Sequence, residues 1–153
     1  MEYGSIIGVY TKDFNPHMEI DMGINFDYFA HPVCLEINSD GNMVVGCKDY
    51  DDDINILVYD INDIANKHVS LKENISIPEE RLSDFSPFGI NDIVIDEQDN
   101  MIVSGLFRSY ILWMNKDGDI IRKIDLKSYV DRLCKDGEGN IYVSLPYLSL
   151  IHI

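Results

Sequence analysis

The sequence predicts an all-β fold, a partial β-propeller with about three blades' worth of four-stranded antiparallel sheets. One observation is a unit of apolar strand, acidic turn and second apolar strand, which occurs at 33–47, 90–105 and 130–144. A second is a two-strand stretch, residues 5–22, that aligns without a gap on residues 109–126. Repeats built from four short strands are typical of propeller blades.

The repeated turns set the spacing of the blades. Asn42, Asn100 and Asn140 occupy the same turn position, where tolerance of positive φ favours a tight hairpin. The intervals between them are 58 and 40 residues. A polar insertion at 64–87 explains the longer interval, and we predict one helical turn near residues 79–82 within it.

The elements then follow in order within residues 1–147. We expect the outer two strands of one blade at 5–22, full blades at 33–78 and 90–126, and the inner two strands of a further blade at 130–147. Propellers close with four to eight blades, so we expect an incomplete ring. Uncovered sheet faces forfeit about 1.5–3 kcal/mol per large aliphatic side chain, and the free edges favour aggregation or dimerisation.

The last six residues, LSLIHI, match the translation of an adapter used in sequencing library preparation. We therefore treat residues 148–153 as an adapter-derived tail, leave them out of the fold prediction, and exclude His152 as a ligand.

Charge and composition exclude several classes of function. The chain has 27 acidic and 12 basic residues, a formal charge of −15. This argues against nucleic acid and anionic membranes as partners. No apolar run is long enough to span a membrane and no signal peptide begins the chain, so its localisation stays open. The three cysteines, without a CxxC spacing, are predicted to be buried thiols.

Residues 86–124 resemble the NHL repeat, whose outline of Pro-x-Gly-Ile, acidic strand end, turn Asn and Asp-Gly is matched at Pro87, Gly89, Ile90, Asp96, Asn100 and Gly118. The resemblance implies a six-bladed ring that binds a protein or small-molecule ligand. The chain is thus expected to be a ligand-binding or interaction scaffold.

Two shorter resemblances imply other functions. GINDIVID, residues 89–96, resembles the gluconolactonase family, in which an Asn at the position of Asn91 helps to hold a divalent metal. This implies a metal-dependent lactonase or lyase as the alternative, with a hydrogen-bonded strand start as the other role for Asn91. Residues 128–145 are similar to the sensor propellers of two-component signalling proteins.

A second candidate metal site lies at Asp49, Asp51 and Asp53, spaced as in the first half of a calcium loop. Ile54 stands where such a loop needs Gly, and Asp60 where it needs a bidentate Glu. The other interpretation is a solvated acidic turn. Calcium or another divalent metal is therefore the only cofactor considered.

Position in the predicted fold provides the remaining candidates. The first strand of each blade lines the central channel, and its start lies at the mouth where ligands usually bind. The polar residues there are His31, Asn91, Asp92, Asp131 and Arg132. Alternatively, they hydrogen-bond to loop backbone. No nucleophile elbow, Ser-His-Asp set or phosphate loop occurs, so no catalytic residue is predicted.

Overall fold

A computed structural model describes residues 5–22, 31–48, 54–77, 89–146 and 148–152. They form four antiparallel sheets. The strands of these sheets are, in order, β1 (Ile6–Tyr10) and β2 (Pro16–Asp21); β3 (His31–Ile37), β4 (Met43–Lys48), β5 (Ile54–Asp60) and β6 (Ser70–Ile77); β7 (Ile90–Ile95), β8 (Met101–Gly105), β9 (Tyr110–Met114) and β10 (Ile120–Asp125); and β11 (Arg132–Lys135), β12 (Ile141–Leu145) and β13 (Leu148–His152). Within each sheet, neighbouring strands are consecutive in the chain.

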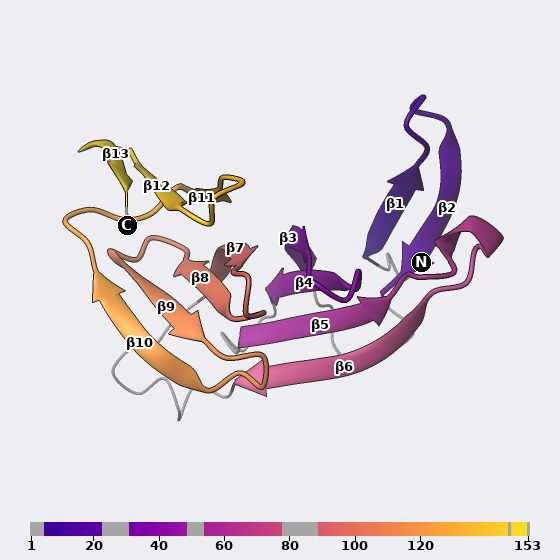
Figure 1. Ribbon diagram of the computed structural model, residues 1–153, viewed down its shortest axis with the longest axis horizontal. Coiled ribbons are helices and arrows are strands. Elements are labelled where there is room, and N and C mark those ends of the chain that lie inside the picture. Colours follow the sequence, from indigo (N-terminus) through magenta and orange to yellow (C-terminus); the bar gives the residue numbers. More distant parts are fainter. Residues whose placement is uncertain (1–4, 23–30, 49–53, 78–88, 147, 153) are drawn as a thin grey trace.

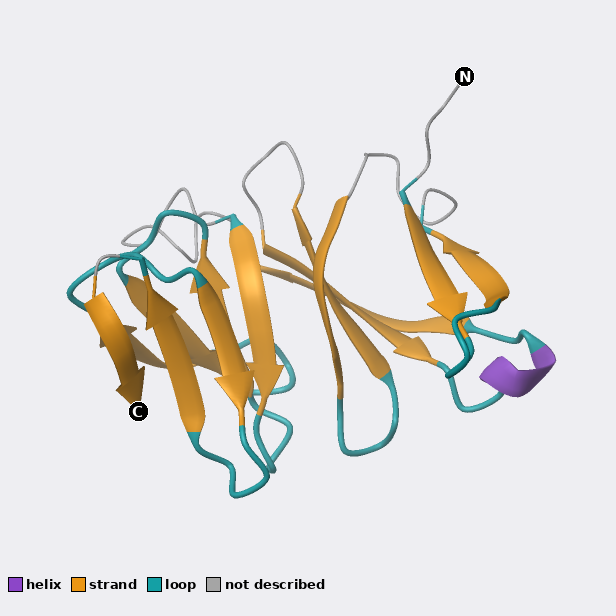
Figure 2. Cartoon of the chain, turned by 90° about the horizontal axis from the view of Figure 1, so that it is seen from above, coloured by secondary structure: helices purple, strands orange, loops and turns teal. Residues whose placement is uncertain are grey.

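The sheets follow an arc (Figure 1). Strands β3 and β7 lie on its concave side and β6 and β10 on its convex side, while β1–β2 and β11–β13 form its two ends. Seen from above, the sheets stand in a row, from the end that carries the N-terminus to the end that carries the C-terminus (Figure 2). Within the described residues no helix is long and apolar enough to cross a bilayer.

Strands β8 and β9 are buried on both faces of their sheet. In β8, Met101 and Val103 pack against the sheet β3–β6, whereas Ile102 between them packs against β11–β13. In β9, Leu112 and Ile111 divide in the same way. Because successive side chains of a strand point to opposite faces, burial of both faces requires the near-continuous apolar runs that the sequence contains.

Within the described ranges one turn recurs five times, at 11–15, 38–42, 96–100, 115–119 and 136–140. In each, the first residue donates its N–H to the fifth carbonyl, and the fourth donates its N–H to the first carbonyl. In these turns the fourth residue, such as Gly41 or Asp99, has a positive φ of between 60° and 85°, and the Asn after it does not. The prediction that the turn Asn needs positive φ is therefore wrong.

The turn asparagines act instead through their side chains. Asn100 and Asn140 each donate Nδ2–H to Oδ2 of the Asp that opens the turn, Asp96 or Asp136, at 2.8 Å. The same Asp accepts two backbone N–H groups through Oδ1. The pattern Asp-x-x-x-Asn is therefore a side-chain lock on the hairpin.

Two details differ from the sequence-based expectation or lie beyond it. Residues 148–152 pair with β12 as β13, so the last sheet has a third strand where two were expected, and the adapter origin of the tail stays a prediction. The helical turn expected at 79–82 lies outside the described residues. A short 3₁₀ helix occurs earlier in the same insertion, at Ile64–Asn66.

Candidate ligand-binding site in the central channel

A cavity of about 520 Å³ opens on the concave side of the arc. It is lined from β1, β3, β7 and β11, by Ile6, Ile7, Gly8, Pro32, Val33, Cys34, Leu35, Asp92 and Arg132. One wall is apolar, and Asp92 and Arg132 are its charged lining residues. This is the place where the inner strands of a propeller surround the central channel.

Three of the lining residues are equivalent positions of the repeat. Cys34, Asp92 and Arg132 each lie eight residues before the turn Asn of their sheet. Asp92 and Arg132 line the same cavity, and ligand binding by these strand starts at a channel mouth stays a prediction. Repetition places these side chains side by side along the arc although about 40 to 60 residues separate them in the chain.

Asn91 and Asp92 hold the sheet β7–β10 to the next sheet. Asp92 Oδ2 accepts the N–H of Leu133 at 2.8 Å, and Oδ1 accepts the N–H of Ile93 at 3.1 Å. Asn91 donates Nδ2–H to the carbonyl of Asp131 at 2.7 Å. These contacts are the backbone hydrogen bonds considered as the alternative role, and they make both residues structural clips between sheets.

Arg132 is the charged group left available in the cavity. Its backbone N–H donates to Ser144 Oγ at 3.0 Å, while its side chain is exposed. Among the described residues, no hydrogen bond or ion pair engages the guanidinium group. A planar fork of N–H donors without a partner is suited to a carboxylate or another planar anion.

Cys34 lies beneath these charges and is held in the neutral form. Burial raises the pKa of its thiol to about 12, with the charge of Asp92 acting in the same direction. The thiol fits because Gly46 lies beside it: a β-carbon at Gly46 would be 2.5 Å from Sγ. In the other sheets Ser104 and Ser144 replace this glycine. The packing role of Gly46 was not predicted from the sequence. The signal was the aligned repeats, which have Gly at this position in one sheet and Ser in the other two.

The other predicted residues lie elsewhere. His31 contacts Ser5 Oγ through Nδ1 at 3.1 Å and does not line the cavity. Asp131 is exposed at the start of the last sheet, where its N–H donates to the carbonyl of Ser144. Asp49, Asp51 and Asp53 fall outside the described residues. In the part of the chain that is described, no three His, Cys, Asp or Glu side chains are grouped to hold a metal.

The cysteine prediction is correct for two of three residues. Cys34 and Cys47 are buried, but Cys134 is exposed. Cys134 lies on the face of the last sheet that points away from β7–β10, which its alternation with the buried Leu133 explains.

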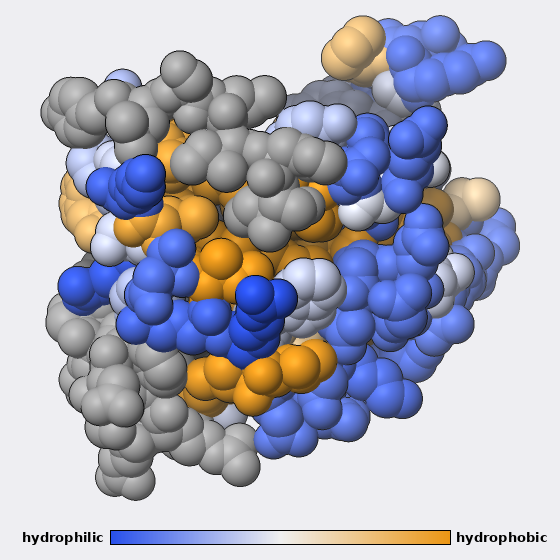
Figure 3. Space-filling model, turned by 60° about the vertical axis from the view of Figure 1, so that its left-hand side comes forward, coloured by the Kyte–Doolittle hydropathy of each residue, from blue (hydrophilic) through white to orange (hydrophobic). Residues whose placement is uncertain are grey.

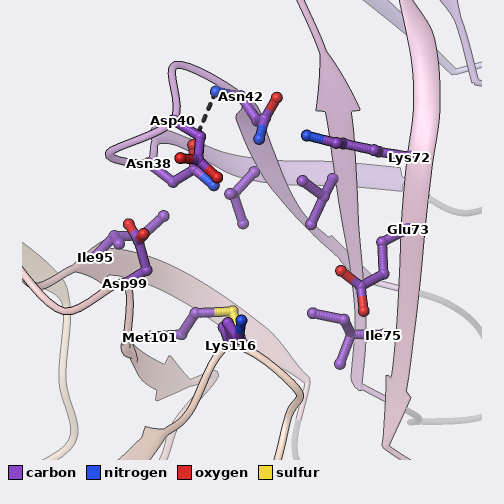
Figure 4. Close-up of a pocket in the computed structure, with 12 residues that line it drawn as sticks. Asn38, Asp40, Asn42, Lys72, Glu73, Ile75, Ile95, Asp99, Met101 and Lys116 are labelled. Atoms are coloured by element: carbon purple, nitrogen blue, oxygen red, sulfur yellow. Dashed lines mark hydrogen bonds between the residues drawn. The ribbon is translucent and has the colours of Figure 1, made fainter.

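A second cavity, of about 240 Å³, lies between the sheets β3–β6 and β7–β10 on the side of the repeated turns (Figure 4). Its lining combines apolar and charged residues, namely Asn38, Asp40, Asn42, Val44, Val58, Lys72, Glu73, Ile75, Ile95, Asp99, Met101 and Lys116. Asn42 is 2% exposed, and no described residue donates to its Oδ1. In this turn Asn38 stands where Asp96 and Asp136 stand in their turns, and Asn38 Oδ1 accepts the N–H of Asn42 at 2.8 Å.

A clip between turns closes this cavity on one side. Ser39 donates its N–H to Asp99 Oδ1 at 2.9 Å and its hydroxyl to Oδ2 at 2.5 Å. Both hydrogen bonds lower the pKa of the Asp99 carboxyl group, and the bond from the Ser39 hydroxyl has the larger effect. The sequence analysis missed this contact because Asp99 was read only as part of the acidic turn.

Comparison with known proteins supports the fold. No protein-family model and no curated protein sequence matches the chain. Solved structures do match. A catalytically inactive virginiamycin B lyase from Staphylococcus aureus with quinupristin gives a TM-score of 0.65 at 10% identity, over 98% of this chain and 48% of that chain.

Two further structures agree. A candidate gluconolactonase gives a TM-score of 0.64 at 17% identity, over 95% of this chain and 44% of that one. A protein of unknown function from Bacteroides caccae gives 0.61 at 12% identity, over 99% and 54%. The chain therefore spans about half the length of these structures. Identities this low speak to architecture alone, and with the sheets described above they show that the chain folds as part of a β-propeller.

Proposed function

We propose that the chain is part of a six-bladed, NHL-like propeller that acts as a ligand-binding scaffold through its central channel. The observation that carries the proposal is the Arg132 guanidinium, which no described residue engages, in a cavity that is otherwise lined largely by apolar residues. Six blades are supported by the lengths of the similar structures, which are about twice that of this chain with its three blades' worth of strands.

The cavity favours a ligand with one anionic group and an apolar body. Arg132 offers paired N–H donors to the anion, and Val33 and Leu35 offer apolar contact. The two oxygens of Asp92 accept the backbone N–H groups of Ile93 and Leu133, so Arg132 is the lining residue that offers hydrogen-bond donors to the anion. The net charge of −15 repels anions at long range, so we expect weak binding at low ionic strength and stronger binding near 0.15 M salt.

Benzoate is a suitable probe because it joins a carboxylate to an apolar ring. Titration followed by two-dimensional ¹H–¹⁵N NMR should give saturable shifts for Val33, Leu35 and Arg132, and benzamide should give none. Arg132→Gln should weaken benzoate binding at least tenfold. Lys127→Gln, which removes an exposed cation away from the cavity, is the matched control. Equal binding by both variants would contradict the proposal.

A metal-dependent lactonase or lyase is the second candidate. It is favoured by the resemblance of residues 89–96 and by the names of two similar structures. Asn91 would coordinate through Oδ1, which leaves its Nδ2 contact with Asp131 in place. The described residues hold no further ligands grouped with it, so they do not by themselves fit a metal centre.

This alternative has its own test. Calorimetric titration with Ca²⁺, Zn²⁺ and Mn²⁺, together with hydrolysis of glucono-δ-lactone, should show metal-dependent turnover that Asn91→Ala abolishes if the lactonase interpretation is correct. Metal binding in the Asn91→Ala variant would instead point to the acidic run at Asp49, Asp51 and Asp53. The sensor interpretation stays a prediction from residues 128–145.

A further inference from the structure

The second cavity, between the sheets β3–β6 and β7–β10, has an apolar interior. Val44, Val58 and Ile75 of the first sheet and Ile95 and Met101 of the second line it, and each is at most 8% exposed. On the outer surface, as on the face shown in Figure 3, apolar patches lie among hydrophilic side chains. In the cavity the apolar side chains are gathered in one hollow, with charged groups around them (Figure 4).

The volume of the second cavity limits the size of a ligand. It is about 240 Å³, below the roughly 300–1,000 Å³ of sites for drug-sized ligands. Since one water molecule takes up about 30 Å³ in the liquid, the cavity has room for a ligand of roughly eight non-hydrogen atoms. The cavity is therefore suited to a small metabolite and too small for a nucleotide cofactor.

A β-bulge brings two opposite charges to the rim of this cavity. Glu73 lies opposite Val58 and Leu71 opposite Tyr59, so Lys72 is an extra residue in β6. Neighbouring side chains of a regular strand point to opposite faces, but Lys72 and Glu73 both line the cavity. The bulge thus places an ammonium group and a carboxylate on the same side of the sheet.

The same bulge recurs in the hairpins β1–β2 and β9–β10, but with other residues. His17 is the extra residue of β2, and Ile121 is the extra residue of β10. The residues that follow them are Met18 and Arg122, so among these three described hairpins a pair of opposite charges at the bulge occurs in β6 alone. The fold provides the bulge, and the sequence of one sheet provides the charges.

The polar groups at this rim are available to a ligand. Among the described residues, no hydrogen bond or ion pair engages the side chain of Lys72 or of Glu73. Lys72 extends toward Asn42, and Glu73 points into the cavity (Figure 4). Asn42 is 2% exposed, and its Oδ1 has no donor in the described part of the chain. Because a buried acceptor without a donor is costly, a ligand that supplies a donor gains affinity.

The rest of the rim favours a ligand with both charges. Asp40 and Lys116 add one charge of each sign, and both carboxylate oxygens of Asp99 accept hydrogen bonds from Ser39. A simple anion would meet the carboxylates of the rim, and a simple cation would meet its ammonium groups. A ligand that carries an anionic and a cationic group side by side matches the pair of charges in β6.

We propose that the second cavity binds a small apolar α-amino acid in its zwitterionic form. Lys72 donates to the α-carboxylate, and Glu73 accepts from the α-ammonium group. The amide of Asn42 offers a donor and an acceptor to the same two groups. The apolar side chain of the ligand packs between Ile75 and Met101, which belong to the two facing sheets. This site shares no lining residue with the channel cavity.

L-Valine is the probe, because it combines this size with both charges and an apolar side chain. Titration of the chain followed by methyl ¹H–¹³C NMR should give saturable shifts for Val58, Ile75 and Met101. Isovalerate is valine without its ammonium group, and isobutylamine is valine without its carboxylate. Each should bind at the second cavity at least about tenfold more weakly than valine, because one charge-assisted hydrogen bond is lost.

Two variants test the roles of the charges. Lys72→Gln and Glu73→Gln should each weaken valine binding at least about tenfold, with an unchanged circular dichroism spectrum, because both side chains are exposed. Glu73→Gln should not weaken isovalerate binding further, since this probe lacks the group that Glu73 binds. Lys127→Gln and Glu138→Gln remove exposed charges outside both cavities and should bind valine like the unchanged chain.

The channel cavity is followed in the same spectra. Its proposed ligand is a carboxylate on an apolar body, so isovalerate should shift Val33 and Leu35, and the absence of these shifts would count against the channel ligand alone. Valine shifts confined to Val33 and Leu35, or no saturable shift of Val58 and Met101, would overturn the zwitterion site. Equal affinity of valine and isovalerate at Val58 and Met101, or equal binding by the two variants and their controls, would overturn it as well.

Discussion

The fit of Cys34 beside Gly46 gives a quantitative test of how the blades pack. Gly46→Ala adds a β-carbon 2.5 Å from Cys34 Sγ and 2.9 Å from Ile90 Cγ2. Ordinary contacts between such atoms are about 3.5–4.0 Å, so at least one neighbour must move. Both neighbours belong to the buried interface between the sheets β3–β6 and β7–β10.

Overpacking of a filled core costs about 1–3 kcal/mol. Replacement of Gly by Ala within a strand returns about 0.5–1 kcal/mol. We therefore expect Gly46→Ala to lower the free energy of unfolding by about 1–2 kcal/mol, measured by urea denaturation at one fixed protein concentration. Cys34→Ala removes the closest contact of the new β-carbon. The double variant should therefore be destabilised by about 0.5–2 kcal/mol less than the sum of the two single variants.

Cys47 provides the matched control for this cycle. It is a buried thiol next to Gly46 in β4, but its side chain packs on the opposite face, against β1–β2. Gly46→Ala and Cys47→Ala should therefore be additive within about 0.5 kcal/mol. Additivity in the Cys34 cycle, or equal coupling in both cycles, would refute the packing described for this interface.

Three further predictions concern the repeated turn. Phe14 is 87% exposed at φ 60°, a conformation that costs an L-residue about 1–2 kcal/mol, so Phe14→Gly should raise the urea midpoint, and a lower midpoint would contradict this. Gly118→Ala forces a side chain into φ +84° with its β-carbon 2.5 Å from Ile75 Cγ2, so it should destabilise by about 1–3 kcal/mol, and a neutral effect would speak against the turn geometry. The side-chain hydrogen bond from Asn140, chief among several, lowers the pKa of Asp136 from 3.8 to about 2. A lowered pKa favours the folded state above the unfolded value, so this contribution should be present above pH 3.8 and be lost as the pH falls toward 2. Asp136→Asn should remove that part of the pH dependence, and an unchanged profile would exclude the assignment.

The channel residues show how far an alignment of the repeats can reach. The repeat alignment indicated that Asp92 and Arg132 occupy equivalent strand starts, and both line the central cavity. The alignment did not separate their roles. Asp92 accepts the N–H of Leu133, which is 41 residues away, whereas the described residues contain no sheet after β11–β13 that Arg132 could contact. Only the neighbouring sheet decides whether such a residue is a clip or an available ligand contact.

The sequence by itself determined most of the strands and the positions of the repeated turns, because each depends on residues close together in the chain. The direction of a side chain in a strand alternates from one residue to the next, and the hydrogen bonds between Asp96 and Asn100 lie within a single turn. The tertiary structure alone decided which faces are covered. Leu35 and Leu133 occupy the same repeat position, yet Leu35 is exposed and Leu133 is buried, because the distant sheet β7–β10 packs on Leu133 whereas no sheet in the described part of the chain buries Leu35. Burial of a sheet face depends on what stands opposite it, and no local pattern contains that information.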